Sequence, residues 1–309
     1  MRYYFRTFAF AFITLTIISC GSNPYSKTNK MHREQSKELT KQLNIFPPER
    51  SPEEALLPYG EDWVGTTNFS LRKPNFVILH HTAQDSLEQT LSTFTLTRTQ
   101  VSSHYVIGKN GKIYHMLNDY YRAWHAGAGK WGNNTDLNST SLGIELDNNG
   151  VEPFSPVQIE SLLQLLKVLK EKYNIPAANF IGHSDIAPAR KVDPNIFFPW
   201  KLLAEEGFGL WYDEDIFETA AGIEEQMNSI PVPAEDSAET VDSTQTFILG
   251  QEKILDVEPE VALRIIGYDT SNLSAAIQAF KLHFVQGEIT PELTERDLMI
   301  LNNLYRKYL

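Results

Sequence analysis

A chain of 309 residues, 42% of them hydrophobic, can bury the core of one large domain or of two smaller ones. Its formal net charge of −12 argues against nucleic acid, and against an anionic membrane surface held by a basic patch, as the main partner. Evidence for function therefore has to come from the order of the residues.

The first twenty residues have the pattern of an export signal. An apolar run from Thr7 to Ser19 follows two arginines and is too short to span a membrane. It leads into Cys20, the single cysteine of the chain, and Gly21. This stretch resembles a bacterial lipobox, which implies a signal peptide over residues 1–19 and lipidation of Cys20. The alternatives are a signal peptide with a chance cysteine or a plain membrane anchor.

Lipid on Cys20 would tether the mature protein to a membrane of the cell envelope. A lone cysteine fits this use, because an exported chain with one cysteine has no intramolecular disulfide partner for it. Residues 20–55 are largely polar and suit a tether. Glycine rather than aspartate after Cys20 favours the outer membrane, with the protein facing the periplasm.

Residues 75–81, with the sequence NFVILHH, follow Pro74 and predict a short buried strand. His80 and His81 close this strand and should lie at its carboxyl end, where α/β sheets commonly carry their sites. Asp85 or Ser86 can then cap a helix.

The next strands are expected in a hairpin and in a second apolar run. Segments 103–107 and 112–116 flank an Asn-Gly pair, the strongest hairpin turn signal. Segment 142–146, LGIEL, has a buried-strand pattern broken by the charge of Glu145. A lone carboxylate in an apolar strand is costly, so Glu145 is either functional or paired with a nearby Lys or Arg.

A long helix and a last strand complete this pattern. Residues 155–158 resemble a capping box with proline at the first helical position, and apolar residues recur at helical spacing up to Tyr173. Residues 179–182 predict a short strand that leads into His183. Strands alternating with helices, plus the hairpin, predict an α/β domain over residues 56–212, with a central mixed β-sheet flanked by helices.

The remainder of the chain differs in composition. Residues 213–247 contain a stretch rich in Pro, Ser, Thr and acidic residues, which predicts a linker or a disordered insertion. Helical periodicity over 258–266, 272–283 and 291–308 predicts a small all-helical module within residues 248–309. This module shows no metal-type cluster and is expected to serve docking rather than chemistry.

The stretch HSDIAPARKVD at residues 183–193 suggests a metal site. Its first and last residues, His183 and Asp193, are ligand types for a borderline metal such as zinc. His80 or His81 could supply a third ligand from the first strand, and spacing alone does not choose between them. Two histidines and one carboxylate leave the fourth zinc position to water, as a hydrolytic site requires.

Two further charged residues suit hydrolysis. Glu145 could take a proton from the attacking water and later pass it to a leaving amine. Lys191 lies two residues before Asp193, where a cation would be repelled by a metal unless an anion lies between them. The oxyanion of a tetrahedral intermediate would be that anion.

Five motifs in order resemble the type 2 N-acetylmuramoyl-L-alanine amidases, zinc enzymes that share a fold with the peptidoglycan recognition proteins. They are HHTA at 80–83, SSHYVI at 102–107, AWHAG at 123–127, SLGIELDN at 141–148 and GHSDIAPARKVDP at 182–194. The resemblance covers roughly residues 60–211. Segment 267–284 resembles part of a peptidoglycan-binding-like module, as in the lipoprotein amidases of the bacterial envelope.

The resemblance implies a role for each matching residue. His81 falls where relatives often have tyrosine, so it is expected to neighbour the site without binding metal. His32 and His283 are expected outside the site. The implied set comprises Zn²⁺ ligands His80, His183 and Asp193, the general base Glu145 and the oxyanion-stabilising Lys191.

Three residues are candidates for substrate binding. His104, Trp124 and His125 either line the groove or pack beneath it, and the sequence does not choose between these readings. His115, in the hairpin, is expected to be structural.

The implied function is that of a membrane-anchored hydrolase of peptidoglycan or muropeptides. It would cut between N-acetylmuramic or anhydro-muramic acid and L-alanine during cell-wall turnover or recycling. A monomer is expected, with no nucleic-acid partner. The main alternative is a non-catalytic peptidoglycan recognition protein, which is disfavoured because the ligand set, Glu145 and Lys191 are all present. A zinc peptidase cutting within the stem peptide would use nearly the same chemistry, and only the resemblance disfavours it.

Overall fold

The computed structural model describes residues 23–45, 51–52, 70–71, 73–218 and 257–309. The chain divides into two compact units, Met1–Phe69 and Ser70–Leu309. The predicted signal peptide and Cys20 lie outside the described residues.

The described part of the first unit is mainly one helix, α1 (Ser26–Leu43), which has no buried residue. It occupies much of the segment predicted as a polar tether, for which the sequence had suggested no helix. None of the helices among the described residues combines the length and apolar character needed to cross a membrane.

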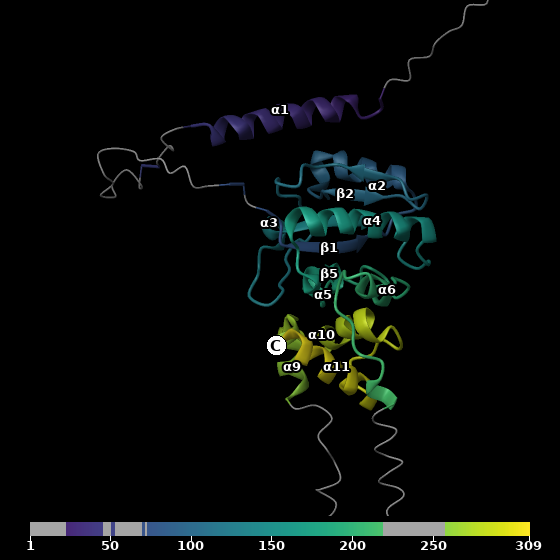
Figure 1. Ribbon diagram of the computed structural model, residues 1–309. Helices are drawn as coiled ribbons and strands as arrows, with labels where there is room; N and C mark the ends of the chain where they lie inside the picture. The colour runs from purple at the N-terminus through teal and green to yellow at the C-terminus, as the bar shows by residue number, and fades with distance from the viewer. Residues whose placement is uncertain (1–22, 46–50, 53–69, 72, 219–256) are drawn as a thin grey trace, which may run out of the picture. The chain divides into compact units, whose positions relative to one another are not determined.

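A five-stranded mixed sheet forms the centre of the second unit (Figure 1). Its strands lie in the order β3-β2-β4-β1-β5. β2 and β3 form the predicted antiparallel hairpin, and the other neighbouring strands run parallel. The fold class predicted from the sequence is confirmed. The strands are β1 (Phe76–His81), β2 (Tyr105–Ile107), β3 (Ile113–His115), β4 (Ser141–Leu146) and β5 (Phe180–Gly182).

Helices connect the strands and follow the sheet. In the first part of the unit these are α2 (Leu87–Thr95), α3 (Leu137–Thr140), α4 (Pro156–Tyr173), α5 (His183–Ile186) and α6 (Trp200–Glu205). The C-terminal helices are α9 (Pro259–Ile266), α10 (Leu273–Phe280), its π-helical continuation η5 (Lys281–Val285) and α11 (Glu295–Tyr308). The three helical periodicities predicted after residue 257 correspond to these elements.

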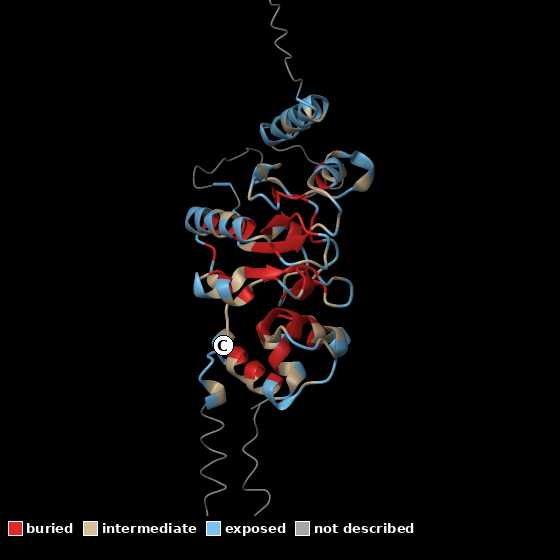
Figure 2. Cartoon of the chain, turned by 90° about the vertical axis from the view of Figure 1, so that its right-hand side faces the viewer, coloured by how far each residue is buried: buried red, intermediate tan, exposed pale blue. Residues whose placement is uncertain are grey.

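Alternate side chains of the strands point into two separate cores. On one face, Val77 and Leu79 of β1 pack with the apolar stripe of α4. On the other face, Ile78 belongs to a core shared by α5 and the C-terminal helices. Figure 2 shows buried residues both in the sheet and in the C-terminal helices. The C-terminal helices therefore supply part of the cover of the sheet.

The capping box predicted at the start of α4 is wrong. Ser155 is the N-cap residue, but its side chain makes no capping hydrogen bond. Gln158 instead turns inward, where its Nε2 donates to the carbonyls of Ile107 at 2.8 Å and Asp147 at 3.1 Å. A buried amide is stable only when hydrogen-bonded, so the tertiary contact takes precedence over the local cap. Ser86, by contrast, caps α2 as predicted.

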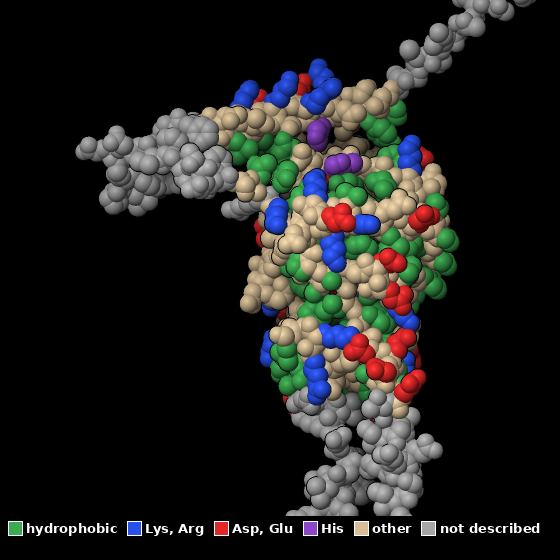
Figure 3. Space-filling view, in the orientation of Figure 1, with side chains coloured by type: hydrophobic (Ala, Val, Ile, Leu, Met, Phe, Trp, Pro, Cys, Tyr) green, Lys and Arg blue, Asp and Glu red, His purple; other side chains and the backbone are tan. Residues whose placement is uncertain are grey.

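Acidic and basic side chains are mixed on the surface of this unit. Figure 3 shows acidic side chains interspersed with lysine and arginine over the visible face. Asp213, at the start of the predicted linker, pairs with Lys307 of α11 at 2.7 Å. Residues 219–247 of that predicted linker lie outside the described residues.

Candidate metal centre

Strand register brings the first two site residues together. β1 and β4 are parallel neighbours, and His80 pairs with Glu145. Residues in register on adjacent strands point to the same face of the sheet, so these two side chains emerge side by side. Ser141 and Gly143 precede Glu145 on that face, and their small size leaves room there for histidine rings. His183 begins α5 directly after β5.

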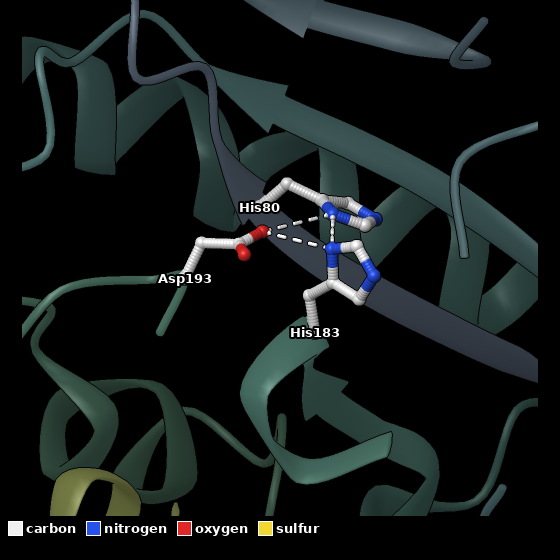
Figure 4. A group of neighbouring side chains, drawn as sticks. All are labelled: His80, His183 and Asp193. Carbon is white, nitrogen blue, oxygen red and sulfur yellow. Dashed lines mark hydrogen bonds and ion pairs between the residues drawn. The ribbon is translucent and has the colours of Figure 1, made fainter. Parts of the chain in front are cut away.

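Three buried side chains converge at one point (Figure 4). The Nδ1 atoms of His80 and His183 lie 2.9 Å apart. Asp193 Oδ2 lies 3.1 Å from the first and 3.0 Å from the second. These three side chains could hold a metal ion, and they are the residues that the sequence proposed as ligands. His81, on the next position of β1, packs against Gly150 instead, as a side chain of the opposite face should.

The second nitrogen of each imidazole is held by the protein. His183 Nε2 donates to the carbonyl of Ala126 at 3.0 Å, so its Nδ1 presents a lone pair. His80 Nε2 lies 3.0 Å from His125 Nδ1, and His125 Nε2 lies 3.2 Å from Ser141 Oγ. The Ser141 hydroxyl donates to a backbone carbonyl and therefore accepts from His125. His125 then accepts from His80, whose Nδ1 is left as a lone pair as well.

Three acceptor atoms thus face one another, two imidazole nitrogens and a carboxylate oxygen. Such an arrangement is repulsive by itself, and a divalent cation turns the repulsion into ligation. Two histidines and one carboxylate form a known ligand set of catalytic zinc. Hydrogen bonds from the far ring nitrogens, like those to Ala126 and His125, orient metal-binding histidines. The residues present therefore fit zinc.

Burial has different effects on the acid and base groups of the site. It lowers the pKa of His80 to about 4, helped by the neighbouring His183. His80 is thus kept in the neutral form that binds metal.

Glu145 has the opposite shift. Burial, together with the charge of Asp193, raises its pKa to about 8, and the Lys191 ammonium opposes this rise. A carboxyl group that titrates near neutral pH suits general acid–base catalysis.

The candidates for substrate binding differ in exposure. His104 is fully buried, with Nδ1 accepting from the Gly143 amide and Nε2 donating to the Tyr121 carbonyl, each at 3.0 Å. His125 is also buried and supports His80. These contacts favour the packing reading for both histidines. Trp124 is 50% exposed and stays a candidate for contact with substrate.

His115 has the structural contacts expected of it. Its ring stacks on Tyr105 at 4.4 Å, and its Nε2 lies 3.2 Å from Asp119. Sequence reasoning missed the supporting roles of Ser141 and the Ala126 carbonyl. Both lie inside quoted motifs, but a serine or a backbone carbonyl carries no ligand signal of its own.

Replacing Gly143 with alanine is expected to disturb the support of His80. A Cβ at this position would lie 2.4 Å from Cγ of His125, whose nitrogens are already engaged by His80 and Ser141. Overpacking of this kind costs about 1–3 kcal/mol, so the free energy of unfolding in urea should fall by about that amount. Gly287→Ala is the control, since its Cβ would meet no atom closer than 3.7 Å. Equal stability of the two variants would contradict the packing argument.

Residues 70–196 match the protein family described as N-acetylmuramoyl-L-alanine amidase. Over 153 residues the chain is 42% identical to N-acetylmuramoyl-L-alanine amidase AmiD of Escherichia coli (strain K12), covering 44% of this chain and 54% of AmiD. Over 103 residues it is 38% identical to 1,6-anhydro-N-acetylmuramyl-L-alanine amidase AmpD of Haemophilus influenzae, covering 33% of this chain and 56% of AmpD. The chain spans about half the length of these curated relatives.

Solved structures extend the likeness beyond the amidase domain. AmiD from E. coli, in complex with anhydro-N-acetylmuramic acid-L-Ala-D-gamma-Glu-L-Lys, matches with a TM-score of 0.60 and 29% identity, covering 79% of this chain and 93% of that one. AmpDh3 from Pseudomonas aeruginosa matches with a TM-score of 0.62 and 27% identity, covering 82% and 99%. These TM-scores confirm the amidase fold. The matched share of this chain is larger than the segment 70–196 that matches the family.

Proposed function

We propose that this chain is a zinc-dependent N-acetylmuramoyl-L-alanine amidase. It would hydrolyse the amide between N-acetylmuramic or anhydro-muramic acid and L-alanine in cell-wall turnover or recycling. The observation that carries the proposal is the convergence of His80, His183 and Asp193 beside Glu145, within a domain that matches the amidase family. The complex of AmiD with an anhydro-muramyl peptide supports anhydro-muropeptides as one substrate class.

The chain's own residues have distinct tasks in this reaction. His80 and His183 would hold zinc through Nδ1, and Asp193 through Oδ2. When bound, zinc would polarise the scissile carbonyl and acidify the attacking water. The Glu145 carboxylate would take the proton of that water and deliver it to the leaving amine of L-alanine. The Lys191 ammonium would stabilise the negative charge that develops on the carbonyl oxygen.

A non-catalytic recognition protein is the second candidate. Binding of a cell-wall fragment needs neither a buried general base nor an ammonium next to a metal site. Glu145 is buried on the same face of the sheet as the metal cluster. The positive charge of Lys191 acts to lower the pKa of both Glu145 and His80. These two residues favour the enzyme.

The same proposal includes a location. The N-terminal pattern around Cys20 and Gly21 supports a lipid anchor in the outer membrane, with the enzyme facing the periplasm. Its partners would then be peptidoglycan, muropeptides and the membrane that holds the lipid, and the protein would act as a monomer.

Mass spectrometry of muropeptides incubated with the purified protein tests the function, with Cys20→Ser used to keep the chain free of lipid. We expect release of intact stem peptides that begin with L-alanine, loss of this activity in a chelator, and its return with zinc. Intact muropeptides after incubation with zinc-loaded protein would establish the recognition-protein alternative. Cleavage between amino acids of the stem would instead identify a peptidase.

A further inference from the structure

We propose that Tyr268 and His283, in the C-terminal helices, are positioning residues for the metal ligand His183 and act on it through Asp185. The sequence placed His283 outside the site, and it does not touch the metal ligands. Its effect would pass through the short helix that carries His183. The inference rests on the proposed zinc site.

Asp185 links the C-terminal helices to the metal centre. It lies two residues after His183 in α5, a helix of only four residues, and its side chain is fully buried. Tyr268 donates its hydroxyl to Asp185 Oδ1 at 2.7 Å. Asp185 Oδ2 accepts from His283 Nδ1 and from the Gly182 amide, each at 2.7 Å. Two of these three donors therefore come from residues beyond 257.

His283 is itself held rigidly. Its ring stacks between Trp200 at 3.8 Å and Phe284 at 4.0 Å. It belongs to η5, where α10 continues with π-helical geometry. Such π-helical turns are rare and frequently occur at functional sites. The ring is therefore fixed with Nδ1 toward Asp185.

The C-terminal helices also contact the loop whose Ala126 carbonyl accepts the hydrogen bond from His183. Gly132, in the loop that follows Ala126, donates its amide to the Gly267 carbonyl at 2.7 Å. Trp131 of this loop packs edge-on against Tyr268 with ring centroids 5.0 Å apart. A Cβ on Gly267 would lie 2.5 Å from the Trp131 ring, so glycine is required for this approach. The loop carries the Ala126 carbonyl that accepts from His183.

A four-residue helix has little stability of its own, so α5 depends on tertiary contacts for its orientation. Removing a donor from Asp185 would leave a buried carboxylate partly unpaired, and the helix would shift to find water or another donor. A metal site tolerates displacements of only about 0.5 Å. The C-terminal helices would thus tune metal binding without touching the metal.

Zinc affinity of full-length variants tests this role, measured by competition with a chromophoric chelator and accompanied by the visible spectrum of the cobalt-substituted protein. We expect Tyr268→Phe and His283→Leu each to weaken zinc binding about tenfold, as loss of an outer hydrogen bond does, and to change the cobalt spectrum. His283→Gln retains an N–H donor and should recover much of the affinity. Leu304→Ala, in the same buried core as Tyr268, is the matched control, because a leucine side chain cannot donate a hydrogen bond to Asp185.

The control separates positioning from general stability. Leu304→Ala should lower the melting temperature while leaving zinc affinity and the cobalt spectrum unchanged. If Tyr268→Phe and His283→Leu behave like Leu304→Ala, the C-terminal helices only stabilise the fold and the inference is overturned. If the wild-type protein binds no zinc, both the proposed function and this inference fail. If the wild-type protein binds zinc and the two variants bind it with the same affinity, only the inference fails.

Discussion

Glu145→Gln is expected to bind zinc normally and to lose turnover by about 10²–10⁴-fold, the usual contribution of a general base. Glutamine preserves the shape of the side chain but cannot accept the proton of the attacking water. Glu145 is buried on the same face as His80 but is not one of the three converging ligand residues. Replacing Glu145 should therefore lower kcat and leave zinc binding unchanged.

Release of L-alanine-terminated peptides and zinc content per chain would measure both effects. Glu160→Gln, on the exposed side of α4, is the matched control and should leave both unchanged. Unchanged turnover in Glu145→Gln would remove this residue from the mechanism, and loss of zinc would make it a ligand. Because the base must be ionised, kcat/KM should rise with pH toward the Glu145 pKa, which burial raises to about 8. Bound zinc, as a nearby cation, would lower the pKa of Glu145 and so shift this rise in kcat/KM to lower pH.

Asp193→Ala is expected to remove both zinc binding and activity. Asp193 Oδ2 lies within 3.1 Å of both imidazole nitrogens and supplies the negative charge of the set. Loss of an outer partner of a metal ligand costs about 10–100-fold in affinity, so loss of the ligand itself should exceed about 100-fold. Chelator competition and peptide release would report the two losses separately.

Asp85→Ala provides the control for Asp193→Ala, since Asp85 is exposed and outside the cluster. It should retain zinc and activity. If Asp193→Ala holds zinc with wild-type affinity, the metal is bound by a different set of residues. His81, next to His80 on β1, would then be the first residue to examine.

Local sequence patterns were sufficient for the strands and for most helices. The run predicted at 75–81 is β1 (Phe76–His81), because a short apolar segment bounded by proline has few alternatives to a buried strand. The capping box at α4 failed because Gln158 found buried carbonyl partners on Ile107 and Asp147, which are distant in sequence. Hydrogen bonds between residues far apart in the chain produce no local pattern in the sequence.

The candidate chemistry could be predicted from residue types and their order. Residue type and order around His80, Glu145, His183 and Asp193 were enough to propose a hydrolytic metal site, because few side chains can bind zinc or transfer protons near neutral pH. Spacing did not separate His80 from His81, and the choice of His80 rested on the family resemblance. The folded sheet supplies the physical reason, since strand alternation turns adjacent residues to opposite faces. The packing of the C-terminal helices against α5 could not be predicted from local patterns, because the hydrogen bonds from Tyr268 and His283 to Asp185 join residues 83 and 98 positions apart.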